Sequence, residues 1–410
     1  MVYDRPTLTI AAGREKALLR HHPWIFSGAV RRVDGSPQEG DLVDVLLPDG
    51  RWVATGHFQN DSIVCKVLSF DTPNIDEAFF RQRLASAINY RWRMGLKSDG
   101  VFRMVHAEGD YLPGLVCDWY KGVLVVQAHS VGMHRLVPML TQLFVDLLEP
   151  YGIKAVFDKS SATCPGGATD GYVWGIEPQE WEINEHGNRM LINFFEGQKT
   201  GFFVDQRENR HLVMQLAAGQ RVLNCFGYTG GFSLAALRGG ASFVETVDIS
   251  RKAIDLCNRN VEMNFGSEAP HRGVVADVLQ YLSGKGIEEK VKASDGEVHI
   301  PRLPLSTFNF IILDPPAFAK NHRSLQAGLK GYRSINQRAL EVLPEGGLLM
   351  TFSCSQAVSR DDFQTMVFTA AMNAHRRVRI VRQLPHAVDH PVSICHPEGE
   401  YLKGLLLQVE

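Results

Sequence analysis

Residues 220–250 read QRVLNCFGYTGGFSLAALRGGASFVETVDIS, and this stretch decides the fold. An apolar run at 221–226 stops at a turn, 227–231, that holds three glycines in five residues. Glycine permits a tight turn and a close approach of the backbone to a ligand. Residues 232–240 then carry Leu and Ala, which favour a helix, and two glycines that end it. A second apolar run follows and ends at Asp248, so the pattern predicts two strands joined by a turn and a helix.

The carboxylate of Asp248 follows the glycine turn by about 20 residues, the geometry that receives ribose hydroxyls in doubly wound folds. A dinucleotide site would use the spacing G-x-G-x-x-G, which the turn G-Y-T-G-G does not match. S-adenosylmethionine has a ribose diol but no phosphate, so it suits this looser turn. The alternative is a glycine turn that merely connects a strand to a helix.

Three later apolar runs also end in polar side chains. They precede Asp277, Asp314 and the tripeptide Ser-Cys-Ser at 353–355. Open α/β sheets bind ligands at the carboxyl ends of their strands, and Asp277 stands where an adenine amino group would be read. This recurrence favours a cofactor site over a plain connection.

Length and composition limit the architecture and the partners. A chain of 410 residues is expected to form two or three domains. The formal net charge of −2 means that any contact with nucleic acid must come from local basic patches. No apolar run reaches the ~18 residues of a membrane span, and charged residues near the N-terminus argue against a secretory signal. We therefore expect a cytoplasmic protein with no membrane partner.

The seven cysteines contain neither a C-x-x-C pair nor a Cys/His cluster with zinc spacing. In a reducing compartment such cysteines are usually unpaired and buried. We expect no disulfide framework and no metal.

The patterns divide the chain into three parts. Residues 1–72 hold short strand patterns around the turn Pro-Asp-Gly at 48–50, and Pro-Trp-Ile-Phe at 23–26 follows a helical candidate. This order resembles a PUA domain, a small RNA-binding module; the alternative is a β-rich accessory domain with no RNA role. Residues 73–195 alternate helical and strand patterns and predict an α+β middle domain. Residues 196–410 contain the glycine turn and are expected to form the cofactor domain.

A basic segment directly precedes the cofactor domain. Lys199 lies in a loop between Gly197 and Gly201, where it could pair with the carboxylate of bound S-adenosylmethionine. Arg207 and Arg210 follow on a predicted helix and could reach a phosphate. The alternative is the start of a helix with surface charges.

Cys354 and Asp314 are the candidate catalytic pair. Cytosine C5 is a poor nucleophile until another nucleophile adds to C6, and a thiolate does this well. A carboxyl group that hydrogen-bonds or protonates N3 stabilises the charge that develops during this addition. The alternative for Cys354 is a small buried residue at a strand end. Its place between Ser353 and Ser355, where the apolar pattern breaks, favours a site that faces a cleft.

Five segments together resemble one family. They read QKTGFFVDQRENR at 198–210, VLNCFGYTGGFSLAAL at 222–237, VDIS at 247–250, ILDPPAFAK at 312–320 and TFSCS at 351–355. With the PUA-like start, they resemble the PUA-containing class I methyltransferases that act on cytosine C5 of 23S ribosomal RNA. The implied fold is α/β, with a C-terminal Rossmann-like domain built on a seven-stranded mixed sheet, an N-terminal β-rich PUA-like domain and an α+β middle domain.

The resemblance also implies site residues and partners. Cys354 would be the nucleophile, and Asp314 the acid that contacts the base. The residues expected to bind S-adenosylmethionine are Lys199, Phe226, Gly227, Thr229, Gly230, Asp248, Ile249, Asp277 and Asp314. Large-subunit ribosomal RNA would be contacted by Arg207, Arg210 and Lys320, and a homodimer is compatible with the family pattern.

One departure concerns the residue after Pro316. Many RNA cytosine-5 methyltransferases carry a second cysteine at this place, which is thought to help release the product. Here the residue is Ala317, so release must rely on another base or on water.

Three other functions compete with this interpretation. A D-P-P-aromatic motif also suits methylation of an exocyclic amine without a cysteine, although Phe318 comes one residue late for that pattern. An RNA-binding or ribosome-assembly factor could keep the cofactor fold without catalysis. A NAD-linked dehydrogenase is disfavoured because the glycine spacing does not fit.

Overall fold

The computed structural model describes residues 5–164, 168–284, 289–293, 296–300 and 303–410, and for 289–293 and 296–300 the backbone alone. The chain forms two compact units. The first unit contains the chain up to Asn184 together with Ile192–Asp205 and Val388–Gly399. The second unit contains Glu185–Leu191, Gln206–Ala387 and Glu400–Glu410. The division at 1–72, 73–195 and 196–410 remains a proposal beside these two units.

A six-stranded sheet begins the first unit, with the strand order β2-β6-β5-β4-β1-β3. Neighbouring strands pair antiparallel except β1 and β4, which run parallel. Side chains such as Leu8, Val43 and Cys65 fill its core and are fully buried. The elements are β1 (Thr7–Ile10), α1 (Lys16–Leu19), β2 (Trp24–Phe26), β3 (Val30–Asp34), β4 (Leu42–Leu46), β5 (Trp52–Phe58) and β6 (Ile63–Ser69).

A five-stranded sheet with the order β11-β10-β9-β8-β7 completes the first unit. Asp76 starts the long helix beside it, because its side chain accepts the backbone amide of Phe79 at 2.9 Å. The elements are α2 (Glu77–Arg93), β7 (Val101–His106), β8 (Leu115–Tyr120), β9 (Val123–Ala128), α3 (Val131–Arg135), α4 (Val137–Leu148), β10 (Ala155–Asp158) and β11 (Gly171–Gly175). The α+β middle part expected from the sequence is confirmed.

Buried charges fasten the segment Val388–Gly399 into the first unit. Arg91 donates to both carboxylate oxygens of Asp110, at 2.5 and 2.8 Å, and Arg103 to both of Asp118, at 2.6 and 3.1 Å. Asp389 joins the two pairs: its side chain accepts the amide of Arg103 at 2.7 Å, and its carbonyl accepts from Arg91 at 2.8 Å. These contacts explain why the segment belongs to the first unit although its neighbours in sequence belong to the second.

Two short strands form a separate sheet after β11. They are β12 (Trp181–Glu185) and β13 (Asn188–Ile192), and the chain passes from one unit to the other along them.

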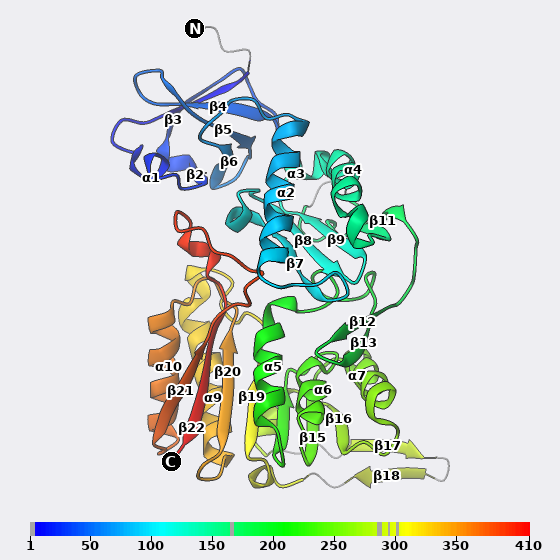
Figure 1. Cartoon of the computed structure of the whole chain (residues 1–410). Helices are drawn as coiled ribbons and strands as arrows, with labels where there is room; N and C mark the ends of the chain where they lie inside the picture. The colour runs from blue at the N-terminus through cyan, green and yellow to red at the C-terminus, as the bar shows by residue number, and fades with distance from the viewer. Residues whose placement is uncertain (1–4, 165–167, 285–288, 294–295, 301–302) are drawn as a thin grey trace. The chain divides into compact units, whose positions relative to one another are not determined.

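The second unit is built on a seven-stranded sheet with the order β16-β15-β14-β19-β20-β22-β21 (Figure 1). The first five strands in this order run parallel, and β22 runs antiparallel to both of its neighbours, so the sheet is mixed as expected. The strands are β14 (Arg221–Cys225), β15 (Phe243–Asp248), β16 (His271–Val275), β19 (Phe310–Leu313), β20 (Leu348–Ser353), β21 (Val378–Leu384) and β22 (Lys403–Val409). A separate antiparallel pair, β17 (Glu289–Ala293) and β18 (Gly296–Ile300), lies between β16 and β19 in the chain.

Helices cover this sheet in two series. One series packs α5 against α6 and α6 against α7, and the other packs α8 against α9 and α9 against α10. The helices are α5 (Arg207–Leu216), α6 (Gly231–Arg238), α7 (Arg251–Phe265), α8 (Val278–Leu282), α9 (Leu325–Val342) and α10 (Arg360–Asn373). None of the helices in the described ranges is both long and apolar enough to cross a membrane.

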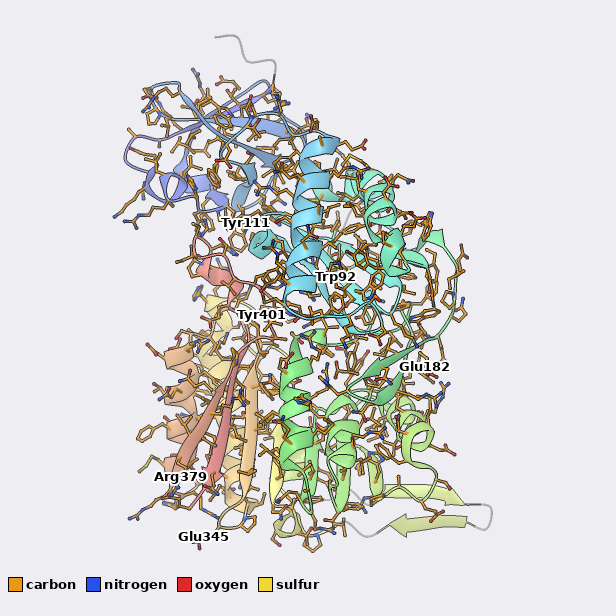
Figure 2. All side chains as sticks on the ribbon, viewed as in Figure 1. Trp92, Tyr111, Glu182, Glu345, Arg379 and Tyr401 are labelled. Carbon is orange, nitrogen blue, oxygen red and sulfur yellow. The ribbon has the colours of Figure 1, made fainter. Side chains whose placement is uncertain are left out.

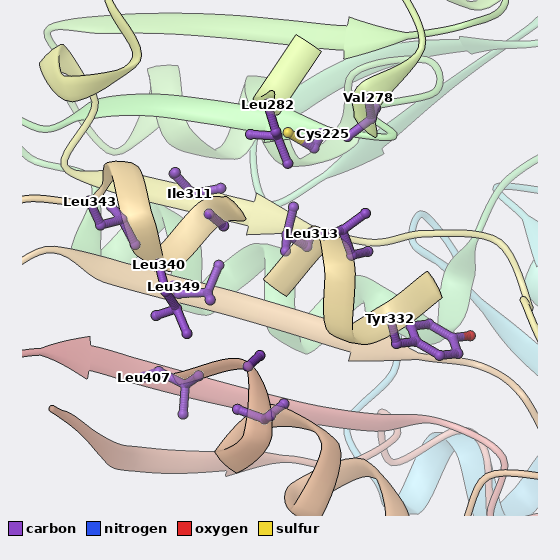
Figure 3. Packing of buried hydrophobic residues seen from close by; sticks show 14 of the residues in the cluster. Cys225, Val278, Leu282, Ile311, Leu313, Tyr332, Leu340, Leu343, Leu349 and Leu407 are labelled. Atoms are coloured by element: carbon purple, nitrogen blue, oxygen red, sulfur yellow. The ribbon is translucent and has the colours of Figure 1, made fainter. Parts of the chain in front are cut away.

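The core under α8, α9 and α10 holds the central strands in place. Cys225, Ile311 and Leu349 from adjacent strands pack there against helix residues such as Leu340, and all four are fully buried (Figure 3). Buried parallel strands need apolar side chains on both faces. Their continuous apolar runs therefore made β14, β15, β19 and β20 predictable from the sequence.

The candidate site residues lie at one edge of this sheet. Parallel strands place all their carboxyl ends together, and β22, which is antiparallel, brings its first residue to the same edge. Figure 2 labels Tyr401, just before β22, at this edge, and Glu345 and Arg379 at the opposite edge.

Candidate active site

The turn after β14 runs through 226–230 into α6. Phe226, Tyr228 and Gly230 have φ angles of 59°, 47° and 86°. L-residues rarely adopt positive φ, and such backbone conformations gather at ligand sites. Two of the three positions are not glycine, so packing must hold the turn in this shape.

Gly227 and Gly230 are required by that packing. A Cβ on Gly227 would lie 2.3 Å from Cγ2 of Thr246, and a Cβ on Gly230 would lie 2.4 Å from Sγ of Cys257. Between them Thr229 is buried. These glycines therefore let the turn lie directly on β15 and α7, and they are needed whether or not a ligand is bound.

Asp248 joins the turn to the tip of β15. Its Oδ2 accepts the backbone amide of Tyr228 at 3.0 Å, and its Oδ1 accepts that of Ser250 at 2.9 Å. Each carboxylate oxygen has a second lone pair. The two amides orient the carboxylate at the strand tip, where a diol could donate to the remaining lone pairs.

Asp277 and Ile249 lie beside this carboxylate. The amide of Ala276 donates to the carbonyl of Asp248 at 2.9 Å, which places the tips of β15 and β16 next to each other. Asp277 caps α8 by accepting the amide of Gln280 at 2.9 Å. Ile249 is 72% exposed, so its apolar surface is open to a planar ligand.

Asp314 lies on the other side of the turn. Residues Cys225 and Leu313 are paired in the parallel ladder of β14 and β19, so Asp314 follows at the tip adjacent to Phe226. Its Oδ1 accepts the side-chain amide of Gln206 at 3.0 Å. The side chain is partly exposed.

Cys354 follows β20, the next strand of the sheet. Leu313 pairs with Thr351 in the ladder of β19 and β20, and the thiol of Cys354 lies 4.0 Å from the carbonyl oxygen of Pro315. The sulfur therefore borders the Asp-Pro-Pro motif that begins with Asp314. The sequence expectation that these two elements meet at one edge agrees with the geometry.

Tyr332 and Ser355 connect the loop after β19 to the loop after β20, and no pattern in the sequence indicated Tyr332. The Tyr332 hydroxyl lies 2.8 Å from Oγ of Ser355, and it accepts the amide of Phe318 at 3.3 Å. Oγ of Ser355 also accepts the amide of Ala319 at 3.2 Å. Tyr332 is fully buried on α9, so only the fold brings it to the motif.

The environment of Cys354 differs from that of the other cysteines in this unit. Cys225 and Cys257 are fully buried. Burial raises the pKa of the Cys225 thiol far above its usual range and that of Cys257 to about 12. Both thiols stay protonated and unreactive near neutral pH. Cys354 is partly exposed, as a nucleophile must be.

Comparison with known proteins identifies the family. The family described as S-adenosylmethionine-dependent methyltransferase matches residues 102–392, and the PUA-like domain family matches residues 8–70. The chain belongs to the S-adenosylmethionine-dependent methyltransferases. Its PUA-like start, expected from the sequence, is confirmed.

Curated relatives of this methyltransferase match over its whole length. "Ribosomal RNA large subunit methyltransferase I" of Escherichia coli O139:H28 (strain E24377A / ETEC) is 38% identical over 98% of this chain and 99% of the relative. The protein of the same name from Salmonella typhi is 38% identical over 98% of each chain.

Solved structures share the fold of this methyltransferase. A SAM-dependent methyltransferase from Streptococcus mutans aligns with a TM-score of 0.81 and 20% identity, over 98% of this chain and 100% of that chain. A methyltransferase complexed with SAH aligns with the same TM-score and 22% identity over the same shares.

The residues at the sheet edge fit the cofactor of this family. S-adenosylmethionine needs acceptors for a ribose diol and for an adenine amino group, and it needs apolar surface beside the adenine. Asp248, Asp277 and Ile249 offer these at adjacent strand tips. No phosphate has to be bound, which agrees with a turn that lacks the dinucleotide spacing.

The predicted basic contacts fall into different environments. Lys199 belongs to the first unit and has a positive φ of 49°. Its Nζ lies 3.8 Å from Oδ2 of Asp205. The second unit holds the other predicted cofactor residues, so pairing of Lys199 with the cofactor carboxylate remains a proposal. Lys320 is exposed beside the Asp-Pro-Pro motif, as a contact to RNA would require.

Arg207 and Arg210 do not have the exposure that a phosphate contact needs. Arg210 is 3% exposed and donates to both carboxylate oxygens of Glu185, at 2.5 and 2.7 Å. Arg207 is 6% exposed and lies 3.1 Å from the Glu208 carboxylate. This burial disagrees with the sequence expectation. For Arg210 the reason is that a periodic pattern does not reveal a carboxylate 25 residues away in the chain.

A polar network packs against the glycine turn at Gly227. Oγ of Ser233 lies 2.8 Å from Nδ2 of Asn224 and 2.6 Å from Oγ1 of Thr246, which lies 2.7 Å from Nε2 of His271. Burial lowers the pKa of His271 to about 4, so the ring is neutral near pH 7.

Within the ranges that the structure describes, His, Cys, Asp and Glu side chains form no group that could hold a metal ion.

Proposed function

We propose that this methyltransferase modifies C5 of a cytosine in 23S ribosomal RNA of the large subunit, with Cys354 as nucleophile. The observation that carries the proposal is the contact between the Cys354 thiol and the Asp-Pro-Pro motif, at 4.0 Å from the carbonyl of Pro315. Relatives named "Ribosomal RNA large subunit methyltransferase I" match nearly the whole chain. The substrate class follows from those names, and the atom from the chemistry of the two side chains.

Cys354 begins the reaction by attacking C6 of the cytosine as a thiolate. A new S–C6 bond forms, and the electron pair of the C5–C6 double bond moves toward C5 and the ring. Asp314 hydrogen-bonds to or protonates N3, which stabilises the negative charge of the adduct. Gln206 donates to Oδ1 of Asp314 at 3.0 Å and so orients this carboxyl group.

The electron pair at C5 then takes the methyl group that bound S-adenosylmethionine would supply; the methyl–sulfur bond breaks, and S-adenosylhomocysteine would leave. A base then removes the C5 proton, the C5–C6 double bond returns, and the S–C6 bond breaks to release Cys354. Residue 317 is Ala rather than Cys, so the base belongs to another side chain or to water.

The setting of the reaction completes the proposal. The PUA-like part would bind the RNA, and Lys199 would pair with the carboxylate of the cofactor. The cytoplasmic location and the homodimer that we expected from the sequence belong to the same proposal.

A single substitution tests the role of Cys354. Purified Cys354→Ala and wild-type proteins are given 23S ribosomal RNA from cells that lack the gene, and the modified nucleoside is located by mass spectrometry. We expect 5-methylcytosine from the wild type and a loss of at least about a thousandfold in the variant. Cys395→Ala is the matched control because Cys395 is the other partly exposed cysteine, and it should keep the wild-type rate.

Other results would favour the competing functions. An N-methylated base with undiminished activity in Cys354→Ala would support methylation of an exocyclic amine. Tight RNA binding by the wild type without methylation would support a non-catalytic assembly factor. RNA that contains 5-fluorocytidine gives a further check, because fluorine at C5 prevents proton loss and should leave the wild-type enzyme covalently attached through Cys354.

A further inference from the structure

Lys403 is a buried cation beside the candidate nucleophile. It is the first residue of β22 and is paired with Ser353 in the antiparallel ladder of β20 and β22. The residue is 5% exposed. Lysine is almost never this buried unless a partner compensates its charge.

The ammonium group is directed to the loop that carries Cys354. Its Nζ donates to the carbonyl of Ser355 at 2.6 Å and to the carbonyl of Tyr401 at 2.7 Å. Both acceptors are neutral. Two carbonyl groups satisfy two of the three N–H donors but do not neutralise a buried positive charge.

A thiolate at Cys354 would provide a negative charge beside this buried ammonium group. Burial is the largest effect on Lys403 and lowers its pKa to about 8, while the negative charges of Cys354 and then of Glu400 act in the opposite direction. This electrostatic coupling is reciprocal, because a cation that an anion stabilises must stabilise that anion equally. Lys403 is still mostly protonated at pH 7.

We propose that Lys403 is a positioning residue that stabilises the thiolate of Cys354 and fixes the loop that presents it. It holds the loop through the Ser355 carbonyl and keeps one positive charge near the sulfur. The inference rests on the proposed function only in taking Cys354 as the nucleophile. Strand β22, the last in the chain, would thus contribute to the chemistry at the end of β20, its neighbour in the sheet.

Other charged and titratable groups around the sulfur come from four places. Tyr332 lies on α9. Burial is the largest effect that raises the pKa of its hydroxyl, and the negative charge of Cys354 acts in the same direction. Asp314 lies at the tip of β19. Arg360 at the start of α10 and Glu400 before β22 form an ion pair, with Nε at 2.8 Å from Oε1. Because that pair is exposed, Lys403 is the buried cation of this set.

Alkylation of Cys354 by iodoacetamide tests the proposal without methylation activity. The rate is followed from pH 6 to 10 by peptide mass spectrometry in full-length wild-type, Lys403→Gln and Lys403→Met proteins. Removal of the charge should raise the midpoint of the pH profile by about one unit. At pH 7 the rate should fall about threefold, because the smaller thiolate fraction is partly offset by the greater nucleophilicity of a more basic thiolate.

The pH profiles of alkylation for the wild type and for Lys403→Gln should therefore cross. Above the midpoint of the variant, its thiolate should react faster than that of the wild type. A lysine with a merely structural role would change the rate by the same factor at every pH. Lys403→Arg, which keeps the charge, should move the midpoint back toward the wild-type value.

Two measurements separate this result from misfolding and from a wrong function. Binding of S-adenosylhomocysteine by calorimetry should be unchanged in Lys403→Gln if the fold is kept. Arg360→Met is the matched control, because it removes an exposed charge from the same neighbourhood, and it should leave the midpoint in place. Identical profiles for wild type and Lys403→Gln, with cofactor binding intact, would overturn the proposal whatever methylation assays report.

Discussion

Each carboxylate oxygen of Asp248 accepts one hydrogen bond from a backbone amide, at 3.0 and 2.9 Å. Asp248→Asn replaces one of these oxygens by an NH₂ group, which cannot accept a hydrogen bond. We expect S-adenosylhomocysteine to bind about 10- to 100-fold more weakly, as the loss of a charge-assisted hydrogen bond implies. Isothermal titration calorimetry measures the effect.

Asp255→Asn is the control for this experiment, since it removes the same charge from an exposed position on α7. Equal affinities for both variants and the wild type would mean that the Asp248 carboxylate does not contact the cofactor.

Single residues were predictable where they end an apolar run. Asp248 is the last residue of β15, and Asp314 and Cys354 directly follow β19 and β20, so the end of each apolar run indicates them. Tyr332 carries no such mark, because it belongs to a helix that meets the motif only in the folded chain. Lys403 does carry a signal, since a lysine that interrupts the apolar run of 402–407 is rare in a buried strand.

Elements were predictable to within a few residues, but their ion pairs were not. The Arg210–Glu185 pair joins α5 to the end of β12 and is almost completely buried. Arg210→Met would leave the Glu185 carboxylate buried without its partner, and this typically costs about 3–5 kcal/mol. We expect chemical denaturation to report a loss of that size in the free energy of unfolding.

Arg338→Met tests whether the effect depends on burial. Arg338 and Glu341 form an exposed pair on α9, at 2.7 Å, and breaking such a pair costs less than about 1 kcal/mol. If Arg210→Met kept full stability and lost only RNA affinity, Arg210 would be an RNA contact after all.

The whole molecule contains histidines whose protonation opposes folding. Burial lowers the pKa of His57 and His271 to about 4, from an ordinary value of 6.5. Between pH 6.5 and 4 the unfolded chain binds protons that the folded chain excludes. The free energy of unfolding should therefore fall as the pH drops through this window, and these residues should have no effect above it.

His271→Gln should remove part of this acid sensitivity. Near pH 5 its stability relative to the wild type should rise by about 2 kcal/mol compared with the same difference at pH 7.5. Thermal unfolding at both pH values provides the comparison, and His375→Gln at an exposed position should behave as the wild type does. A constant difference between His271→Gln and the wild type at the two pH values would contradict a neutral ring in the folded protein.

At the scale of the whole molecule, the sequence indicated the fold class but not the grouping of segments. The sheet of the second unit follows from its apolar runs. The excursion of Val388–Gly399 into the first unit depends on contacts of Asp389 with Arg91 and Arg103, nearly 300 positions earlier in the chain. Interactions over such separations leave no period in the sequence, so a linear division cannot reveal them.

The position of β22 between β20 and β21 determines when the chain can finish folding during its synthesis. Until residues 403–409 leave the ribosome, β20 is an open edge, and its unpaired backbone groups invite pairing with other chains. The first unit is also incomplete until residue 399 has emerged. A nascent chain stopped after β21 would thus contain two unfinished units, and we expect such truncated products to depend on chaperones or to aggregate.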